Sequence, residues 1–236
     1  MTISVVIPAY NEAAELPGTL AALRAQHLSH EVIVVDAGST DSTATVAHEA
    51  GARIVASPRK QRAAQMNLGA SEACGDALLF LHADTRLAPG ALRRIESALR
   101  QPEVVGGGFA RRYQSPSFFL RATCALAEAR TRLCGWFLGD QAIFVRRTAF
   151  AALGGFREWD VFEDLDFSRR LARTGRVVTL RPPVVSAARR FTARGAVRTT
   201  WRDLALTARY LTRRLPHSRP PESLRTAPAG SLCSEP

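Results

Sequence analysis

The sequence predicts a doubly wound α/β fold in a single domain, followed by a basic helical tail. Three observations lead to this prediction. Over the first hundred residues, short continuous apolar runs alternate with segments of helical spacing. The runs are apolar on both faces, which is typical of parallel strands covered by helices on each side. The chain has 236 residues, of which 46% are hydrophobic, and can therefore bury the core of one large domain.

The first hundred residues follow a regular order of strand and helix. Residues 3–8 form a β-branched run, residues 12–26 have helical spacing, and residues 32–36 form a second apolar run. Thr40 and Asp41 can cap a helix that continues to residue 49. The other elements predicted here are a strand at 53–56, a helix at 63–73, a strand at 77–81 and a helix from Pro89 to about residue 100.

The second part of the chain is less regular. A strand at 104–113 contains three consecutive glycines, which indicate the close approach of another backbone. A helix at 118–134, a strand at 142–145, a helix from near Glu163 and a strand at 177–180 follow, and Pro182 and Pro183 are expected to end that last strand. We predict a basic amphipathic helix at 199–215 and a disordered, Pro- and Ser-rich end at 216–236.

The positive charge is concentrated at the C-terminal end. The chain carries 32 Lys and Arg against 21 Asp and Glu, a net charge of +11, and residues 168–236 account for 15 Arg against 3 acidic residues. Such a block attracts the phosphates of a nucleotide, an anionic membrane or nucleic acid, although a solvated basic face explains it equally well. Because no apolar run is long enough to span a membrane and no secretory signal is present, we expect a cytoplasmic location and four reduced cysteines.

Acidic side chains follow three of the predicted strands. They are Glu12, Asp36 with Asp41, and Asp84, and in open α/β sheets this edge binds ligands. Asp84 alone could bridge a divalent cation to a diphosphate, since Mg²⁺ often binds through one or two carboxylates plus substrate phosphates. A second acidic cluster, which contains Glu163 and Asp164, lies at the start of a predicted helix. The helix dipole stabilises negative charge there, which alone could explain the cluster. The alternative is that one of the two carboxylates is a general base.

The sequence motifs of several enzyme classes are absent from this chain. There is no GxSxG, no Walker A sequence and no GxGxxG after the first strand, which disfavours serine hydrolases, P-loop enzymes and dinucleotide-dependent dehydrogenases. Two alternatives stay open, namely a nucleotidyltransferase of related fold and a non-catalytic basic module that binds nucleic acid or an anionic membrane. The carboxylates at three strand ends disfavour a polyanion as the partner, so no nucleic acid is expected.

Five motifs in order carry a resemblance to a known family. They are IPAYNE at 7–12, VVDAGSTDST at 34–43, FLHADT at 80–85, GDQAIFVRR at 139–147 and EDLDFSRRL at 163–171. The chain resembles family 2 glycosyltransferases of GT-A type, with a Rossmann-like mixed sheet. The HAD, GDQ and ARRF segments further resemble a short prokaryotic subgroup labelled arsenosugar-biosynthesis glycosyltransferases. The resemblance implies a domain at 1–198, with a nucleotide-binding half at 1–100 and an acceptor half at 101–198.

The resemblance also implies roles for individual residues. Asp164 would be the catalytic base of an inverting transfer, and Asp84 would hold Mg²⁺ or Mn²⁺ on the diphosphate of a nucleotide-sugar. Residues similar to the family's donor-binding positions are Pro8, Tyr10, Glu12, Asp36, Arg62, His82, Arg189 and Arg190, and Asn67 lies in the segment that covers the donor. Ala37 and His82 replace aspartates that read the base and ribose in many members, so a UDP-sugar is only the default donor. Gln61 replaces a frequent glycine.

The acceptor is expected to approach through residues 107–141. Asp140, Gln141 and Glu163 are the candidate acceptor residues, and Phe109, Phe118, Phe119, Trp136 and Phe137 lie in or beside this segment. These aromatic side chains either belong to the core or face a sugar or lipid. Together with the basic helix at 199–215, they lead to the hypothesis of a lipid-linked acceptor and peripheral contact with the inner face of the membrane.

Overall fold

The computed structural model describes residues 1–187 together with residues 198, 200, 201, 207 and 210. The predicted disordered end at 216–236 and most of the predicted helix at 199–215 lie outside the described residues. The strands are β1 (Ile3–Ala9), β2 (His30–Asp36), β3 (Arg53–Ala56), β4 (Ala77–Phe80), β5 (Thr85–Arg86), β6 (Val104–Tyr113), β7 (Ile143–Arg146) and β8 (Arg176–Ser186). The helices are α1 (Leu16–Arg24), α2 (Thr43–Glu49), α3 (Arg62–Ser71), α4 (Ala91–Leu99), α5 (Phe118–Cys134), η1 (Gly139–Gln141, a 3₁₀ turn), α6 (Arg147–Ala152) and α7 (Glu163–Leu171).

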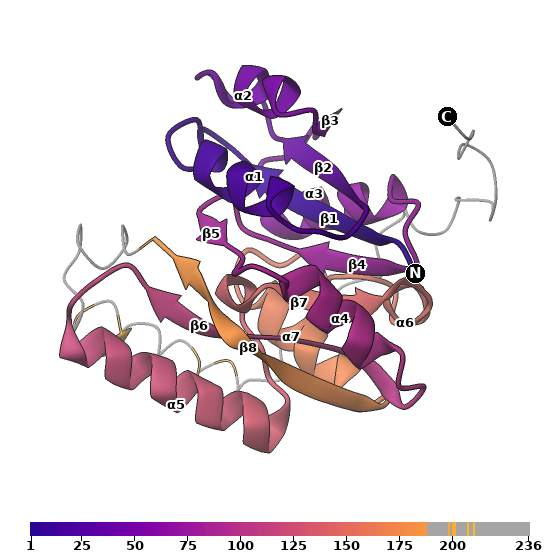
Figure 1. The fold of residues 1–236 in the computed structure, drawn as a ribbon, viewed down its shortest axis with the longest axis vertical. Coiled ribbons are helices and arrows are strands. Elements are labelled where there is room, and N and C mark those ends of the chain that lie inside the picture. Colours follow the sequence, from indigo (N-terminus) through magenta and orange to yellow (C-terminus); the bar gives the residue numbers. More distant parts are fainter. Residues whose placement is uncertain (188–197, 199, 202–206, 208–209, 211–236) are drawn as a thin grey trace.

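The strands form one mixed sheet in the order β3-β2-β1-β4-β7-β6-β8-β5 (Figure 1). The first four strands along the chain, β1 to β4, are parallel. β7 runs antiparallel to both β4 and β6, and therefore joins the two halves of the sheet. The strand order reverses at β1, which lies between β2 and β4, and this is the position at which open α/β sheets bind ligands.

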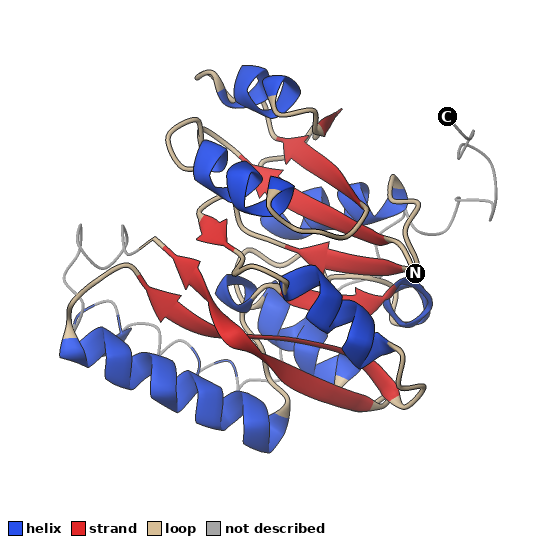
Figure 2. Ribbon diagram, in the orientation of Figure 1, coloured by secondary structure: helices blue, strands red, loops and turns tan. Residues whose placement is uncertain are grey.

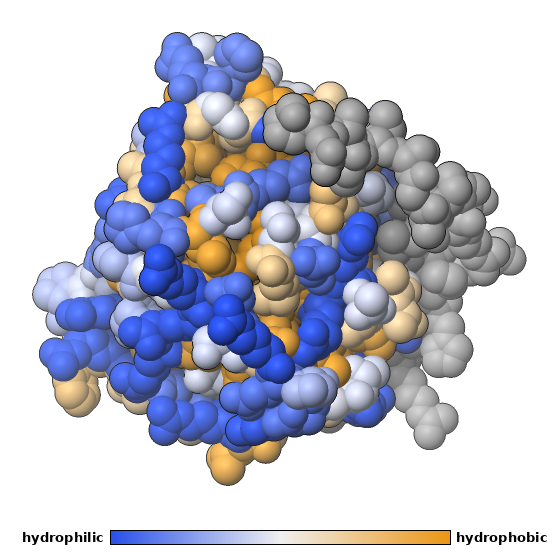
Figure 3. Space-filling model, turned by 45° about the vertical axis from the view of Figure 1, so that its right-hand side comes forward, coloured by the Kyte–Doolittle hydropathy of each residue, from blue (hydrophilic) through white to orange (hydrophobic). Residues whose placement is uncertain are grey.

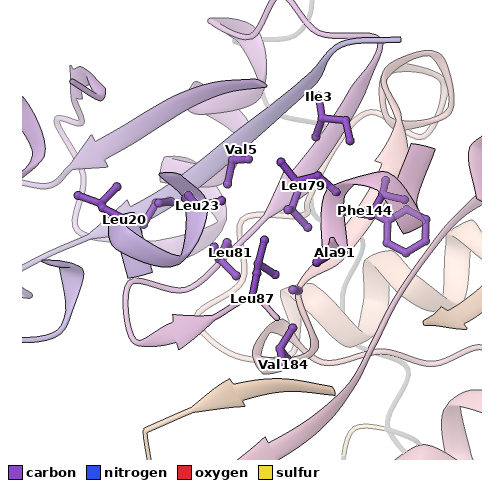
Figure 4. Close-up of a cluster of buried hydrophobic side chains, with 14 of the residues drawn as sticks. Ile3, Val5, Leu20, Leu23, Leu79, Leu81, Leu87, Ala91, Phe144 and Val184 are labelled. Atoms are coloured by element: carbon purple, nitrogen blue, oxygen red, sulfur yellow. The ribbon is translucent and has the colours of Figure 1, made fainter. Parts of the chain in front are cut away.

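Helices cover the sheet on both faces (Figure 2). On one face, Ile3, Val5 and Ile7 of β1 belong to a core cluster with side chains of α1, α2 and α4. On the other face, Val6 belongs to a cluster with α3, α6 and α7. The alternation along β1 follows from the two-residue period of a strand. Leu20 and Leu23 of α1 lie near Val5 of β1 within the first cluster (Figure 4).

The predicted fold class is confirmed, and most predicted elements are present. The structure adds β5, η1 and α6, which are too short to show a periodic pattern. The predicted end of a strand before Pro182 is wrong, because β8 continues to Ser186. The pairing of β6 with β8 shifts register between Phe109 and Arg111, and the two prolines lie opposite this shift. The regular pattern of strand hydrogen bonds is interrupted there, so the strand tolerates residues that have no backbone N–H.

The described cysteines differ in their state. The face seen in Figure 3 is largely hydrophilic, with hydrophobic side chains interspersed among polar ones. Cys124 and Cys134 are free, as expected. Cys74 is disulfide-bonded, so the expectation of four reduced cysteines is wrong at this position, while Cys233 lies outside the described residues.

No helix in the described part of the chain is long and apolar enough to cross a membrane.

Candidate active site

The carboxyl ends of β1 and β2 are held together by Gln65 of α3. The side chain of Gln65 is buried, and its Nε2 donates to the carbonyl oxygens of Ala9 and Val35, each at 2.9 Å. The loops that follow the two strands also bond to each other, since Asn11 Oδ1 accepts from the N–H of Thr40 at 2.8 Å. The two strand ends therefore form one rigid edge.

The predicted donor-binding residues of this edge are all partly accessible. Pro8, Tyr10, Glu12 and Asp36 are half-buried, and the Lys60 Nζ lies 3.3 Å from the centre of the Tyr10 ring. The Asp36 carboxylate is oriented by its own turn: Oδ2 accepts from the N–H of Ser39 at 2.9 Å, and Oδ1 accepts from the Ser39 hydroxyl. A fixed carboxylate beside an aromatic ring and a cation can recognise a polar, planar ligand.

His82 and Asp84 follow β4 at the same edge of the sheet. Both side chains are half-buried. The backbone around them is anchored on two sides, because the Thr19 hydroxyl donates to the carbonyl of Ala83 at 2.7 Å and the N–H of Ala187 donates to the carbonyl of Asp84 at 3.1 Å. The short pairing of β5 with β8 fixes the chain directly after Asp84.

Asp164, in the first turn of α7, meets the η1 turn. Its Oδ2 accepts from the N–H of Gly139 at 2.5 Å, and its Oδ1 accepts from the N–H of Leu165 at 2.6 Å. A Cβ on residue 139 would lie 2.5 Å from His82 Nε2 and 3.2 Å from Asp164 Oδ2, so glycine is required here. Burial raises the pKa of Asp164, and the two N–H donors offset part of that rise. His82, Gly139 and Asp164 thus converge from three separate segments.

Glu163 is adjacent to Asp164 but is only 3% exposed. Its Oε1 lies 3.4 Å from Nη1 of Arg62 at the start of α3. Burial, followed by repulsion from Asp164, raises the pKa of Glu163 to about 7, although Arg62 opposes the rise. The predicted acceptor residue Glu163 and the predicted donor residue Arg62 therefore contact each other.

Asp140 of η1 is held by two residues of β6. Its Oδ2 accepts from Arg111 Nη1 at 2.6 Å and from the Tyr113 hydroxyl at 2.7 Å. Burial alone would raise the pKa of Asp140, but Arg111 and these hydrogen bonds outweigh it and the pKa is lowered. The Oδ1 of Asp140 is buried and has no hydrogen-bond partner among the described residues. An ionised carboxylate with one unused oxygen can accept a hydrogen bond from a ligand.

Gln141 lies in the core rather than at the surface of the site. It is 0% exposed, and its Nε2 donates to the carbonyl of Phe109 at 3.1 Å. Its Oε1 accepts from Arg130 Nη2 of α5 and from the N–H of Leu138, each at 3.1 Å. All of these bonds hold η1 in place. Gln141 therefore positions the turn that carries Asp140.

Other predicted residues fall into different surroundings. Asn67 is 1% exposed and exchanges two hydrogen bonds with the backbone of Phe156, so its side chain is internal. Phe109 and Phe137 are 0% exposed and belong to the core, whereas Phe118 is 82% exposed. Arg189 and Arg190 lie outside the described residues. Sequence reasoning missed Arg111, Tyr113 and Lys60. The available signal for the first two was the run of two arginines and a tyrosine at the end of an otherwise apolar, glycine-containing strand.

A comparison with protein families decides the assignment. The family described as Glycosyl transferase family 2 matches residues 4–153, which is more than half of the chain. The chain belongs to this family. Membership of this family disfavours the two alternatives, a nucleotidyltransferase and a non-catalytic basic module.

Known glycosyltransferases are similar to parts of this chain. An uncharacterized glycosyltransferase of Mycobacterium tuberculosis is 35% identical over 97 residues, which cover 41% of this chain and 43% of that protein. An undecaprenyl-phosphate 4-deoxy-4-formamido-L-arabinose transferase of Sodalis glossinidius is 30% identical over 155 residues, covering 61% of this chain and 48% of that protein. The chain thus spans less than half the length of each of these relatives.

The fold is shared with solved glycosyltransferases. The mannosyltransferase PcManGT from Pyrobaculum calidifontis, solved in complex with GDP-Man and Mn²⁺, has a TM-score of 0.64 and 24% sequence identity. The likeness covers 78% of this chain and 56% of that one. At this identity it shows the fold, which is the GT-A type that the motifs indicated.

The residues at the ligand edge suit a divalent cation held by few protein ligands. Among the described residues, no three or more His, Cys, Asp or Glu side chains gather as a metal-binding group. A hard cation such as Mg²⁺ or Mn²⁺ needs no such group when substrate phosphates and water complete its coordination. Asp84 offers one partly accessible carboxylate at the ligand edge of the sheet, which fits that mode of binding.

Proposed function

We propose that the protein is an inverting glycosyltransferase that moves a sugar from a nucleotide-sugar to an acceptor hydroxyl in one displacement. The observation that carries this proposal is the surroundings of Asp164. Both oxygens of this carboxylate accept backbone N–H groups, and the group lies beside His82 and Gly139 at the ligand edge of the sheet. A carboxylate fixed in this way can take a proton from a hydroxyl that approaches along one line.

In the proposed reaction, Asp164 removes the acceptor proton while the acceptor oxygen bonds to the anomeric carbon. The bond from that carbon to the diphosphate breaks at the same time, so the configuration inverts and no covalent intermediate is required. The raised pKa of Asp164 supports this role, because a more basic carboxylate binds the transferred proton more tightly. Asp140 would hold the acceptor through its unused Oδ1.

The donor would lie along the edge formed by β1, β2 and β4. We assign its base and ribose to Pro8, Tyr10, Glu12, Asp36 and His82, and its diphosphate to Asp84, Arg62, Arg189 and Arg190. A divalent cation at Asp84 would neutralise charge that develops on the departing diphosphate. A UDP-sugar remains the default donor, and the GDP-Man bound by PcManGT supports testing guanosine nucleotides as well.

The acceptor is assigned only by class. The undecaprenyl-phosphate substrate in the name of the Sodalis glossinidius relative supports a lipid-linked acceptor at the inner face of the membrane. The arsenosugar-biosynthesis subgroup, which the HAD, GDQ and ARRF segments resemble, is the more specific alternative. The division into a donor half at 1–100 and an acceptor half at 101–198 stays part of this proposal.

The proposal is tested by thermal unfolding with UDP, GDP, CDP and dTDP, each with and without Mn²⁺. A ligand that binds only the native state at about 100 times its Kd adds about 2.7 kcal/mol to the free energy of unfolding. We expect one nucleotide to raise the Tm, and Mn²⁺ to increase that rise.

Asp84→Asn should remove the effect of Mn²⁺. Asp76→Asn is the matched control, because Asp76 immediately precedes β4, at the opposite end of the strand from Asp84, and its carboxylate accepts from the N–H of Thr2 at 2.9 Å. Equal shifts with and without metal would refute the role of Asp84. No shift with any nucleotide would refute the donor site.

A further inference from the structure

The outward face of α5 is more apolar than its inward face. Phe118 is 82% exposed, Leu126 is 66% exposed and Leu133 is 84% exposed. The buried residues of this helix are Leu120, Ala127 and Thr131, of which two are small. A surface helix of a globular protein normally turns its large apolar side chains inward. The reversed arrangement indicates that α5 has a partner on its outer side.

The exposed apolar residues form one continuous stripe. With 3.6 residues per turn, Phe118, Ala122, Ala125, Leu126, Ala129 and Leu133 fall on the side of the helix opposite Leu120, Ala127 and Thr131. The helix has 17 residues, so the stripe runs along about 25 Å.

The charges beside the stripe are positive. Arg121 and Arg132 lie on one flank of the outward face, and both are exposed. The acidic residue of α5, Glu128, is neutralised by Arg132 at 2.7 Å and by Arg181 of β8 at 2.6 Å. A cavity of about 290 Å³ between α5 and strands β6 and β8 is lined by Arg112, Arg121 and Arg181. This side of the molecule therefore combines apolar side chains with excess guanidinium groups.

We propose that α5 is a docking helix for a membrane surface that contains anionic phospholipids. Phe118, Leu126 and Leu133 would enter the boundary between headgroups and acyl chains, as the apolar face of an interfacial helix does. Arg112, Arg121 and Arg132 would bind lipid phosphates, for which a guanidinium is well suited. A second copy of this chain fits the surface less well, since pairing two such faces would bring arginines together without acidic partners.

The docking helix is directly connected to the candidate active site. Arg130 of α5 donates through Nη2 to Gln141 Oε1 and through Nε to the carbonyl of Trp136, each at 3.1 Å. Gln141 and Asp140 belong to the same 3₁₀ turn. If the acceptor side is as proposed above, docking brings Asp140 close to the membrane surface, where a lipid-linked acceptor is presented. The docking itself does not depend on that function.

The test is co-sedimentation of the full chain with phosphatidylcholine vesicles, with and without phosphatidylglycerol, at low salt. We expect binding only when phosphatidylglycerol is present. Leu126→Glu and Leu133→Glu should each lower the partition coefficient about tenfold or more, because each removes one large apolar side chain from the lipid boundary and adds a negative charge. Arg121→Gln should lower it by a smaller factor that disappears at high salt.

Two control variants separate this surface from the rest of the molecule. Val161→Glu changes an apolar residue that is 55% exposed outside α5, and should leave binding unchanged. Asp164→Asn should bind vesicles like the wild type, so loss of catalysis and loss of docking are distinguishable. Vesicle binding that the α5 variants do not alter would overturn the proposal, as would the absence of any binding. Sedimentation velocity that shows a dimer dissociated by Leu133→Glu would assign the face to a second copy instead.

Discussion

Two adjacent carboxylates, Glu163 and Asp164, occupy different surroundings at the start of α7. Asp164 is fixed by the backbone N–H groups of Gly139 and Leu165, whereas the Glu163 carboxylate lies against the Arg62 guanidinium. An anion in the first turn of a helix is favoured by the helix dipole. The dipole acts on both residues, so the difference between them comes from burial and from the specific donors.

Asp164→Asn should lower kcat about 10²- to 10⁴-fold and leave donor binding unchanged, because the amide keeps the size of the side chain and loses its basicity. Asp160→Asn is the matched control. Asp160 is exposed and its Oδ1 accepts a 3.2 Å bond from Gln61 Nε2, which an amide oxygen can also accept. Steady-state transfer and nucleotide titration measure the two effects. Activity that survives in Asp164→Asn would assign the base to another group.

Glu163→Gln should stabilise the protein more at pH 8 than at pH 5. The pKa of Glu163 is about 7 in the folded protein against a reference value of 4.5. Between these values the folded chain holds a proton that the unfolded chain has released, so stability falls as the pH rises. Glutamine does not titrate and removes this loss. The Tm difference between variant and wild type, measured at both pH values, tests the sign.

Glu103→Gln serves as the control for this titration, since the Glu103 side chain is 56% exposed and its charge is well hydrated. It should change the Tm equally at both pH values. A Tm difference for Glu163→Gln that is larger at pH 5 would contradict the raised pKa.

At the scale of elements, periodic patterns predicted the long helices and strands. They failed where tertiary contacts determine where an element begins or ends. The strand at 104–113 and the helix at 118–134 are found with the predicted bounds. The helix predicted from residue 12 begins only at Leu16, because Pro17 favours the first turn and residues 12–15 form the loop of the site. β8 passes through two prolines because the register shift against β6 removes the need for their N–H groups.

The candidate site shows the same division. The loops after β1, β2 and β4 could be predicted as a ligand edge, because parallel strands end together. The contacts of Asp140 with Arg111 and Tyr113 could not, since they join residues 29 and 27 positions apart across two elements. The internal role of Asn67 was also hidden, because its partner is a backbone group 89 positions away.

At the scale of the whole molecule, the two halves of the chain are joined around the site. β4 and β7 pair in the sheet, and α3 of the first half contacts the segment before α7 in the second. Gln61 donates to the carbonyl of Glu158 at 3.1 Å, and Asn67 donates to the carbonyl of Phe156 at 2.8 Å and accepts from its N–H at 2.9 Å. These bonds set the distance between Arg62 on α3, a predicted donor-binding residue, and the carboxylates of α7.

Asn67→Ala should therefore reduce both stability and catalysis. It leaves a buried N–H and a buried carbonyl of Phe156 without partners, at about 1–3 kcal/mol for each. The released segment also carries Glu163 and Asp164, so kcat should fall although no predicted catalytic side chain is changed. Urea unfolding and steady-state transfer measure the two effects. Ser71→Ala, which removes one exposed bond at 2.8 Å from the same helix, should change the free energy of unfolding by less than about 0.5 kcal/mol. Normal activity in a destabilised Asn67→Ala would mean that α3 and α7 are positioned independently of this contact.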